Sequence, residues 1–438
     1  MIIPLAHKIE LIPNNKQKTY FLKAIGCARF AYNWGLSEWE RKHKAGLPCS
    51  AFQLQKEFNA IKHTLFPFVC EVTKWACAQS LRDLENAYRL FFKKASRKPT
   101  MKKKRDNDGS FYIAGQDVEL SDVNRNSKAI KKTLHNTNLK RQYIKVPKLG
   151  WVKMSERLRF QGKLKNVVIS QEGDKFYASF SMEITKEEYN RTHKQTKKEG
   201  RKAVGIDLGI KSIMVLSDGI CIQNIKPLKG YQKRIKRIER QLEKKVHAKT
   251  KQEKISGIQK SKNYQKQSLR LRRVMNRVEY IRNGFSHKAT SIITSYYSYI
   301  AIENLDVEQM KKKRMIARLL PDAPLGRLSI QLKYKSAIRG VHVVQADQYF
   351  PSSKTCSVCG TVNTNLQLKD RVFDCPRCGS VIDRDYNASI NLLHLINKVG
   401  VDNPELTPAD LTALQYLFTK NGIATSKVET GRRQVIEP

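Results

Sequence analysis

Long hydrophobic runs are missing from this sequence of 438 residues, and acidic residues are scarce. No apolar stretch approaches the ~20 residues that a membrane-spanning helix needs, so we expect no membrane partner. His7 and Lys8 interrupt the first apolar residues too soon for a secretory leader. Outside one cluster the cysteines show no pairing pattern, which predicts buried, reduced thiols in the cytosol; these are Cys27, Cys49, Cys70, Cys77 and Cys221.

The charge balance is strongly basic. There are 83 Lys and Arg residues against 39 Asp and Glu residues, which gives a formal net charge of +44. Self-repulsion of this size opposes folding and is tolerated when a polyanion neutralises it. The basic residues run through the whole chain instead of flanking one amphipathic anchor, which favours nucleic acid over an anionic membrane as the partner.

The chain length is typical of about three domains, and a hydrophobic content of 40% is enough for packed cores. We predict a small, barrel-like β domain from residues 1–14 and 108–190, interrupted by a helical segment at 15–107. Alternating apolar residues at 176–184, after a turn at 172–174, predict a β-hairpin. The polar, basic residues 186–202 are expected to form a linker.

One helix of the N-terminal part carries a clear apolar stripe at helical spacing, formed by Cys77, Leu81, Leu84, Tyr88 and Phe91. The opposite face holds Trp75, Gln79 and Arg82. This face is either solvated, with one chance tryptophan, or a nucleic-acid surface on which Trp75 stacks. The pattern alone leaves both alternatives open.

The second half contains short apolar strands, two of which carry a single acid. Residues 203–209 form an apolar strand that contains Asp207, and a second strand follows closely at 212–216, a pattern that opens many sheets of the ribonuclease H type. A pair of basic helices is expected within 227–297. A strand at 299–305 carries Glu303, and another is expected at 341–346. The tail after residue 400 looks irregular, with a short helix possible at 408–416.

Four cysteines have the spacing of a zinc ribbon. Two Cys-x-x-Cys pairs are separated by fifteen residues, and they are Cys356, Cys359, Cys375 and Cys378. A glycine after each pair allows a tight turn. Four thiolates leave no open coordination position, so one structural zinc ion per chain is predicted. The basic surface around this ribbon includes Arg371, a candidate contact to nucleic acid.

Asp207, Glu303 and Asp385 are the candidate catalytic residues. Each acid alone has an ordinary explanation, such as a helix cap or a solvated strand end. Together they can converge, because paired strands lie about 4.8 Å apart. Three carboxylates suit Mg²⁺ or Mn²⁺, and two such ions can hydrolyse a phosphodiester bond. Asp383 competes for the third position, but Asp385 stands closer to the following helix and is favoured.

Several of these motifs resemble those of one family. Residues 205–209, 302–305 and 383–388 look like the three parts of a split RuvC nuclease domain. Residues 351–360 are similar to the start of the family's zinc ribbon, and residues 147–154 fit its β domain. From about residue 5 to 398 the chain resembles the TnpB family. These are transposon-encoded, RNA-guided DNA endonucleases related to the compact type V CRISPR effectors.

The resemblance implies a multidomain α/β protein. Its RuvC domain, of the ribonuclease H-like class, would comprise 203–352 and 383–398, with a helical insertion at 227–297 and the zinc ribbon at 353–382. The N-terminal β-barrel-like domain would be the wedge domain, with 15–107 as its helical recognition insertion. The tail at 399–438 is expected to be flexible.

The resemblance also implies partners and roles. A guide RNA from the transposon end would pair with double-stranded target DNA, which is recognised beside a short duplex motif and cut on both strands at one site. Asp207, Glu303 and Asp385 would bind two Mg²⁺ ions, the four cysteines would bind Zn²⁺, and the helix containing Trp75 would face the motif duplex. We expect a monomer with one RNA, associated with the nucleoid in a prokaryotic cytoplasm.

Three alternatives differ in class. A nuclease-inactive, RNA-guided repressor is disfavoured by the three intact acids. A DDE transposase would carry its acids in the order Asp, Asp, Glu, and the lack of any His-x-His disfavours a single-strand transposase. An actin-like ATPase could use residues 205–209 as its first phosphate loop. It would need a second glycine-rich loop, and the chain has no Gly-Gly dipeptide.

Overall fold

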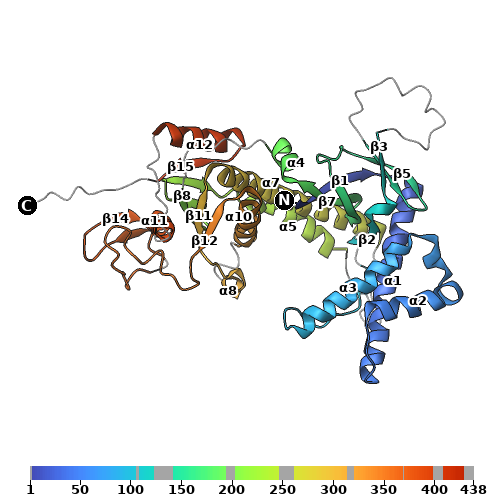
Figure 1. Cartoon of the computed structure of the whole chain (residues 1–438). Coiled ribbons are helices and arrows are strands. Elements are labelled where there is room, and N and C mark those ends of the chain that lie inside the picture. Colours follow the sequence, from blue (N-terminus) through green and yellow to red (C-terminus); the bar gives the residue numbers. More distant parts are fainter. Residues whose placement is uncertain are drawn as a thin grey trace, which may run out of the picture. The chain divides into compact units, whose positions relative to one another are not determined.

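The computed structural model describes residues 2–104, 108–122, 142–193, 203–245, 261–312, 320–367, 369–397 and 408–428 (Figure 1). The chain divides into two compact units, Met1–Lys194 and Gln195–Pro438. Their boundary falls within the expected linker at 186–202. No helix of the described part is both long enough and apolar enough to cross a membrane.

The first unit is built on an antiparallel sheet of seven strands in the order β2-β6-β7-β1-β5-β4-β3. The predicted hairpin is confirmed, with Ile169 opposite Ala178. The sheet is open, because no pairing between the described residues joins β2 to β3, and this differs from the barrel-like expectation. The strands are β1 Ile2–Ile12, β2 Asp108–Ala114, β3 Glu119–Ser121, β4 Tyr143–Val146, β5 Gly150–Met154, β6 Lys163–Glu172 and β7 Lys175–Thr185.

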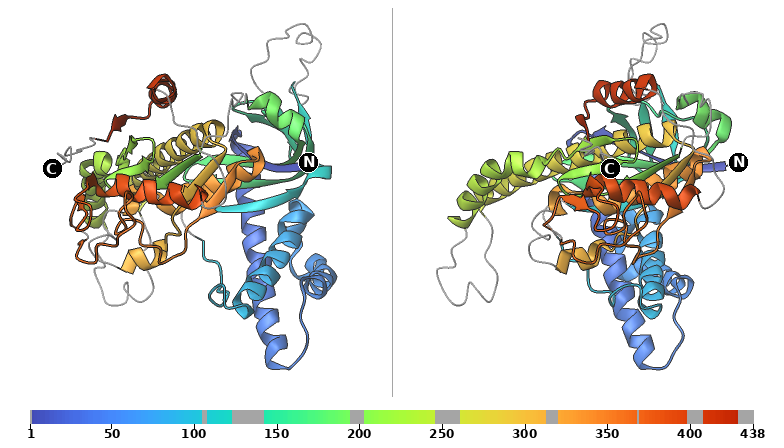
Figure 2. Two further views of the ribbon diagram at one scale, coloured as in Figure 1. Left: turned by 60° about the vertical axis from the view of Figure 1, so that its left-hand side comes forward. Right: turned by 90° about the vertical axis from the view of Figure 1, so that its left-hand side faces the viewer.

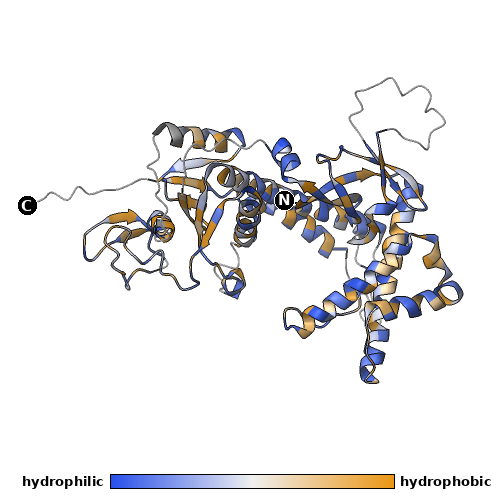
Figure 3. Ribbon diagram, viewed as in Figure 1, coloured by the Kyte–Doolittle hydropathy of each residue, from blue (hydrophilic) through white to orange (hydrophobic). Residues whose placement is uncertain are grey.

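Helices α1 (Asn15–Lys44), α2 (Ala51–Leu65) and α3 (Lys74–Phe92), with the short 3-10 helix η1 (Pro67–Glu71), form the predicted helical segment. Capping boxes start α1 and α2. Figure 3 shows hydrophobic and hydrophilic residues alternating along these amphipathic helices. The α3 stripe packs against α1, and four of its five residues are fully buried.

Two expectations for this part of the chain need correction. The linker begins with a helix, α4 (Lys186–Thr192), because Thr185 caps its first turn and Tyr189 is buried. Residues 194–202 lie outside the described residues. Of the scattered cysteines, Cys27 and Cys77 are buried as expected, but Cys49, Cys70 and Cys221 are only partly buried.

The second unit contains a mixed sheet of six strands in the order β12-β11-β8-β9-β10-β15. β8, β9 and β10 form an antiparallel meander, whereas β11 runs parallel to β8 and β12 runs parallel to β11. The strands are β8 Ala203–Asp207, β9 Ser212–Leu216, β10 Ile220–Gln223, β11 Tyr299–Ile302, β12 His342–Gln345 and β15 Thr425–Lys427. A separate hairpin is formed by β13 (Val372–Asp374) and β14 (Val381–Asp383).

Helices cover both faces of the six-stranded sheet. One face packs on α7 (Lys262–Tyr296), α10 (Leu325–Arg339) and α12 (Pro408–Lys420) through the main core, which includes Val204, Ile206 and Ile302. The other face packs on α11 (Arg384–Asn397) through Ala203 and Ala301. Short helices α8 (Val307–Lys312) and η4 (Leu320–Asp322) connect β11 to α10.

The predicted pair of basic helices is present as α5 (Pro227–Glu243) and α7. Ile235 and Ile238 of α5 pack against Val274 of α7. Figure 2 shows the two helices side by side, reaching away from the sheet.

The prediction of a flexible tail is wrong for residues 408–428. β15 pairs with the edge strand β10, with Ser426 opposite Cys221. Leu414, Phe418 and Ile423 are buried in the core of the second unit. These apolar residues suffice to dock a helix and a strand, although neither element has a strong pattern of its own. Residues 399–407 and 429–438 lie outside the described residues.

Substituting Phe418 with alanine should therefore destabilise the second unit. Phe418 is completely buried, so its truncation leaves a cavity and should lower the free energy of unfolding by about 3–5 kcal/mol. Tyr416→Ala on the same helix is the matched control, because Tyr416 is 61% exposed. Urea unfolding would compare the two proteins, and equal stabilities would contradict a packed C-terminal helix.

Candidate functional site

Two candidate ligands stand at the carboxyl ends of neighbouring strands. Asp207 is the last residue of β8, and Glu303 directly follows β11. The strands run parallel with Ile302 opposite Ile206, so the acids lie side by side one step beyond that pair. Side chains alternate between the faces of a sheet. Both acids therefore share the face of Ala301, which α11 covers.

Helix α11 carries the third acid, Asp385, in its first turn. The helix packs directly on the backbone of β8. A Cβ atom added to Gly205 would lie 2.0 Å from the carbonyl oxygen of Ser389 and 2.5 Å from the backbone nitrogen of Leu393. Gly205 therefore fixes how close the helix and the sheet can be. Sequence reasoning missed this role, although the glycine stands only two residues before Asp207.

Asp383 and Asp385 have different surroundings. The Oδ1 atom of Asp383 accepts the N–H groups of Asp385 and Tyr386, both at 3.0 Å, as a helix-capping carboxylate does. The carboxylate of Asp385 instead accepts a hydrogen bond from the guanidinium of Arg384 at 3.3 Å. This geometry favours Asp385 over Asp383 as the third ligand.

Burial raises the pKa of Asp207 and of Glu303. For Asp207 the largest cause is burial of the carboxyl, followed by the charges of Glu303 and Asp385. For Glu303 burial again dominates, and a hydrogen bond from Ser352 opposes it. Carboxylates that repel each other are stabilised by a bound cation, and hard oxygen ligands suit Mg²⁺ or Mn²⁺. The donor set thus fits the predicted metal.

Arg371 lies at the edge of this acid cluster. Its Nη1 atom is 3.8 Å from Oδ2 of Asp385, and its side chain is about half exposed. Its backbone carbonyl accepts the N–H of Arg384 at 2.9 Å. Arg371 is therefore held beside a candidate catalytic acid while still reaching solvent.

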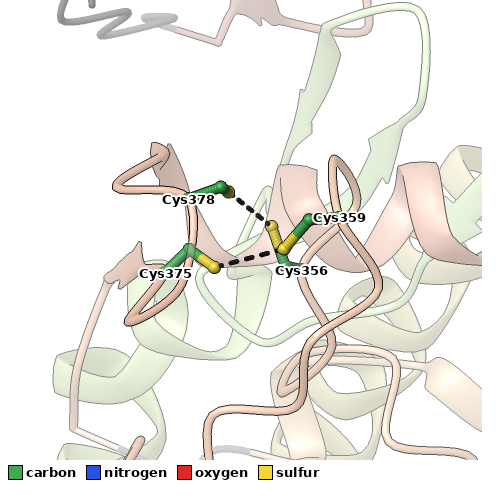
Figure 4. Close-up of side chains that lie close together, drawn as sticks. All are labelled: Cys356, Cys359, Cys375 and Cys378. Carbon is green, nitrogen blue, oxygen red and sulfur yellow. Dashed lines mark hydrogen bonds between the residues drawn. The ribbon is translucent and has the colours of Figure 1, made fainter.

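The four cysteine sulfurs lie close together, as Figure 4 shows. Sγ of Cys356 is 3.7 Å from Sγ of Cys378, and Sγ of Cys359 is 3.5 Å from Sγ of Cys375. Tetrahedral zinc with bonds of about 2.3 Å needs sulfurs roughly 3.8 Å apart. In the part of the chain that the structure describes, this is the one His, Cys, Asp or Glu group whose ligand atoms all lie within 4.8 Å.

The expected tight turns at the cysteine pairs are confirmed. Gly360 donates its N–H to the carbonyl of Cys356 at 2.9 Å, and Gly379 donates to Cys375 at 3.0 Å. Both glycines adopt the left-handed backbone conformation, with φ of 76° and 67°. The buried Phe373 of β13 packs beneath the sulfurs.

Neighbouring hydroxyl groups lower the pKa of two of the thiols and so favour the thiolate form, which binds metal. Thr361 lowers the pKa of Cys359 to about 6, and Ser380 lowers the pKa of Cys378. Burial raises the pKa of Cys356 to about 12, so this thiol needs a cation to stabilise its thiolate form. The site fits one structural Zn²⁺ ion.

Three buried polar residues near both clusters escaped the sequence analysis, namely Ser352, Asn387 and Asn391. The hydroxyl of Ser352 donates a hydrogen bond to Oε1 of Glu303. The side-chain amides of Asn387 and Asn391 both donate to the carbonyl of Thr355. Their spacing of four residues on α11 was the available signal, because it places both on one face of a helix.

The helix face around Trp75 is only partly free. The indole N–H of Trp75 donates to Asp117, and its ring packs edge-on against Tyr112 at 6.0 Å between centroids. Gln79 donates to Asp83 at 3.0 Å, whereas Arg82 is exposed. Trp75 thus connects α3 to the β-sheet of its own unit. Part of its ring remains accessible.

A cavity of about 550 Å³ lies beside this face. Trp75 and Arg82 line it and Gln79 does not, so the structure brings together two of the three expected residues there. Further basic side chains on its lining are those of Lys62, Lys74 and Lys148. A cavity with an aromatic ring among cations suits a nucleic-acid backbone with a stacked base or sugar.

Three family models match the chain in order. Residues 1–47 match "Helix-turn-helix domain", residues 179–314 match "Probable transposase", and residues 326–392 match "Cas12f1-like, TNB domain". The first matched region consists here of strand β1 and helix α1. The third contains the four cysteines and Asp385.

Relatives match over most of the chain. The Escherichia coli K12 protein named "Putative RNA-guided DNA endonuclease InsQ" is 28% identical and covers 89% of this chain and 91% of its own length. A Streptomyces pristinaespiralis protein named "Putative RNA-guided DNA endonuclease" is also 28% identical. The match covers 89% of this chain and 88% of that protein.

Among solved structures, a Cas12f1–sgRNA–target DNA complex contains a similar fold. Its protein has 16% sequence identity and a TM-score of 0.50, with 86% of this chain and 82% of that chain covered. The family models, the relatives and this fold agree with the motifs at 205–209, 302–305 and 383–388. The chain is therefore similar over most of its length to the TnpB/IS605 group of transposase-associated proteins.

Proposed function

We propose that this protein is an RNA-guided DNA endonuclease that cuts target DNA at one RuvC-type site. The observation that carries the proposal is the meeting of Asp207, Glu303 and Asp385 at the carboxyl ends of β8 and β11. The strand order supports a ribonuclease H-like domain, because a three-stranded antiparallel meander continues into two parallel strands. We infer the guide RNA and the DNA target from the relatives, whose names describe RNA-guided DNA endonucleases.

The three acids would hold two Mg²⁺ or Mn²⁺ ions. Bound there, such ions would activate a water molecule and stabilise the leaving oxygen of the phosphodiester. Asp207 and Glu303 are positioned by the sheet, and Asp385 is positioned by α11, so their relative geometry is fixed before a substrate binds. Arg371 and Arg384 place positive charge beside Asp385, where a DNA phosphate would arrive.

The partners follow from the same comparison. We expect one guide RNA from the transposon end per protein monomer, and a double-stranded DNA target recognised beside a short duplex motif. The cavity lined by Trp75 and Arg82 is our candidate for contact with that duplex. The zinc ribbon would hold one structural Zn²⁺ ion, and we expect the protein to be associated with the nucleoid in a prokaryotic cytoplasm.

Replacing Asp207 with alanine should abolish Mg²⁺-dependent cleavage and leave DNA binding nearly unchanged, because the acid acts on the metal and not on the guide. Asp347→Ala is the matched control, since Asp347 is an exposed acid of the same unit. The test uses protein expressed with its native flanking DNA, so that any guide RNA co-purifies. Undiminished cleavage by the Asp207 variant would refute the site, and cleavage by neither wild type nor control would favour a repressor.

Sequencing the co-purified RNA separates a guided enzyme from an unguided one. One discrete RNA with a constant body and a variable 3′ end is expected. Random cellular RNA would instead point to a nuclease that acts on DNA structure, or to a transposase.

Substituting Cys375 with serine should remove zinc and unfold the ribbon. Structural zinc contributes roughly 10–16 kcal/mol to the folding of small modules. Elemental analysis should find about one zinc per wild-type chain and much less in the variant, whereas Cys221→Ser, outside the cluster, should retain it. A natively folded wild-type protein without zinc would show that the cysteines have another role.

Substituting Arg82 with alanine should weaken binding of duplex DNA. Loss of one phosphate contact reduces the slope of log K against log salt by about 1. Arg89→Ala is the control, because Arg89 is exposed on the same helix but does not line the cavity. Fluorescence anisotropy at several salt concentrations measures both slopes. Identical slopes for the two variants would show that the duplex does not contact the cavity.

A further inference from the structure

The segment that leads from β12 to the first cysteine pair contacts both candidate metal sites. Ser352 lies in this segment and is 4% exposed. Its hydroxyl donates to Oε1 of Glu303, and its backbone carbonyl accepts the side-chain amide of Asn391 at 2.8 Å. One buried serine therefore joins an acid of the nuclease-like sheet to helix α11.

Helix α11 forms hydrogen bonds with the same segment at two further residues, Thr355 and Ser357. The carbonyl of Thr355 accepts the amides of Asn387 at 2.7 Å and of Asn391 at 2.6 Å. The N–H of Ser357 donates to Oδ1 of Asn387 at 2.9 Å. Both asparagines are buried, so each hydrogen bond would leave an unsatisfied polar group if it were broken.

The zinc ribbon is attached to this network at both ends. Cys356 stands between Thr355 and Ser357, the two residues that Asn387 binds. The second cysteine pair continues through β14 to Asp383, which caps α11. The two turns that would be joined by zinc are thus both linked to the helix that carries Asp385, one through Asn387 and the other through Asp383.

The carboxylate of Glu303 needs a second group to fix its orientation. It lies just beyond the end of β11, and glutamate has more rotatable bonds than aspartate, so the strand alone fixes its carboxylate less firmly than that of Asp207. A hydroxyl that donates to one oxygen selects one orientation and leaves other lone pairs of the carboxylate for a cation. Mutation of a residue that orients a metal ligand in this way typically lowers metal affinity or activity by about 10- to 100-fold.

We propose that Ser352 is a positioning residue for Glu303, and that the zinc ribbon holds Ser352 in place. Zinc occupancy then controls the affinity of the nuclease site for its divalent cations. The inference rests on the proposed function, since it assumes that Glu303 binds a catalytic metal. It assigns the ribbon a role inside the nuclease unit, separate from any contact with nucleic acid.

The first test compares Ser352→Ala, Ser352→Thr and Ser353→Ala in the full chain with its co-purified RNA. Titration with Mn²⁺, followed by electron paramagnetic resonance, measures cation affinity without relying on cleavage. Ser352→Ala should bind Mn²⁺ about 10- to 100-fold more weakly while keeping its zinc, its DNA binding and its thermal midpoint. Ser352→Thr retains the hydroxyl and should recover most of the affinity, and Ser353→Ala should resemble wild type.

Wild-type Mn²⁺ affinity in Ser352→Ala would overturn the positioning role, and so would a failure of Ser352→Thr to exceed the alanine variant. These outcomes differ from a failure of the proposed function. In that case the wild type itself would neither bind Mn²⁺ through Asp207 nor cleave DNA, whatever residue stands at position 352.

A double-mutant cycle tests the dependence on zinc. Cys359→Ser should lose zinc and weaken Mn²⁺ binding by a factor similar to that of Ser352→Ala. Because both changes act through one network, the double variant should be little weaker than either single variant. Unchanged Mn²⁺ affinity after zinc loss, or full additivity of the two effects, would show that the sites are independent.

Discussion

The contact between the backbones of α11 and β8 is the constraint on which the second unit depends. Gly205 admits the helix where any side chain would collide with Ser389 and Leu393. Ala203 and Ala301 extend the same flat surface. The opposite face of the strands carries Val204, Ile206 and Ile302, which form a thick apolar core. Small residues on one face and large ones on the other therefore place a helix, and its acid, directly over the strand ends.

Two kinds of metal chemistry are built onto this frame. The cysteines combine soft sulfur ligands with hydroxyl groups that favour the thiolate form, whereas the acids present hard oxygens. Burial, followed by the charges of the neighbouring acids, raises the pKa of Asp207. Arg371 and Arg384 place positive charge beside Asp385 within a strongly basic chain, and such a chain attracts polyanions.

The features that could be predicted were those with strict local patterns. The spacing of the cysteine pairs and the period of the 77–91 stripe reflect geometry within one turn or one helix, and both were confirmed. The parallel pairing of β8 with β11 places Asp207 and Glu303 side by side, as their strand patterns predicted. The docked segment around Phe418 was missed, because its stability comes from a distant core and not from its own sequence. Ser352 and Asn391 were missed because their partners lie 36 or more positions away.

Strand β15 occupies the edge of the sheet beside β10, more than 200 residues later in the chain than its partner. Pairing across such a separation forms late in folding, because the intervening chain must first be ordered. A ribosome that has synthesised β8, β11 and all four cysteines has therefore still not released the last strand of the sheet. The unit that carries the acids becomes complete only after β15 has been synthesised, so translation products that stop before β15 would lack one edge strand of this sheet.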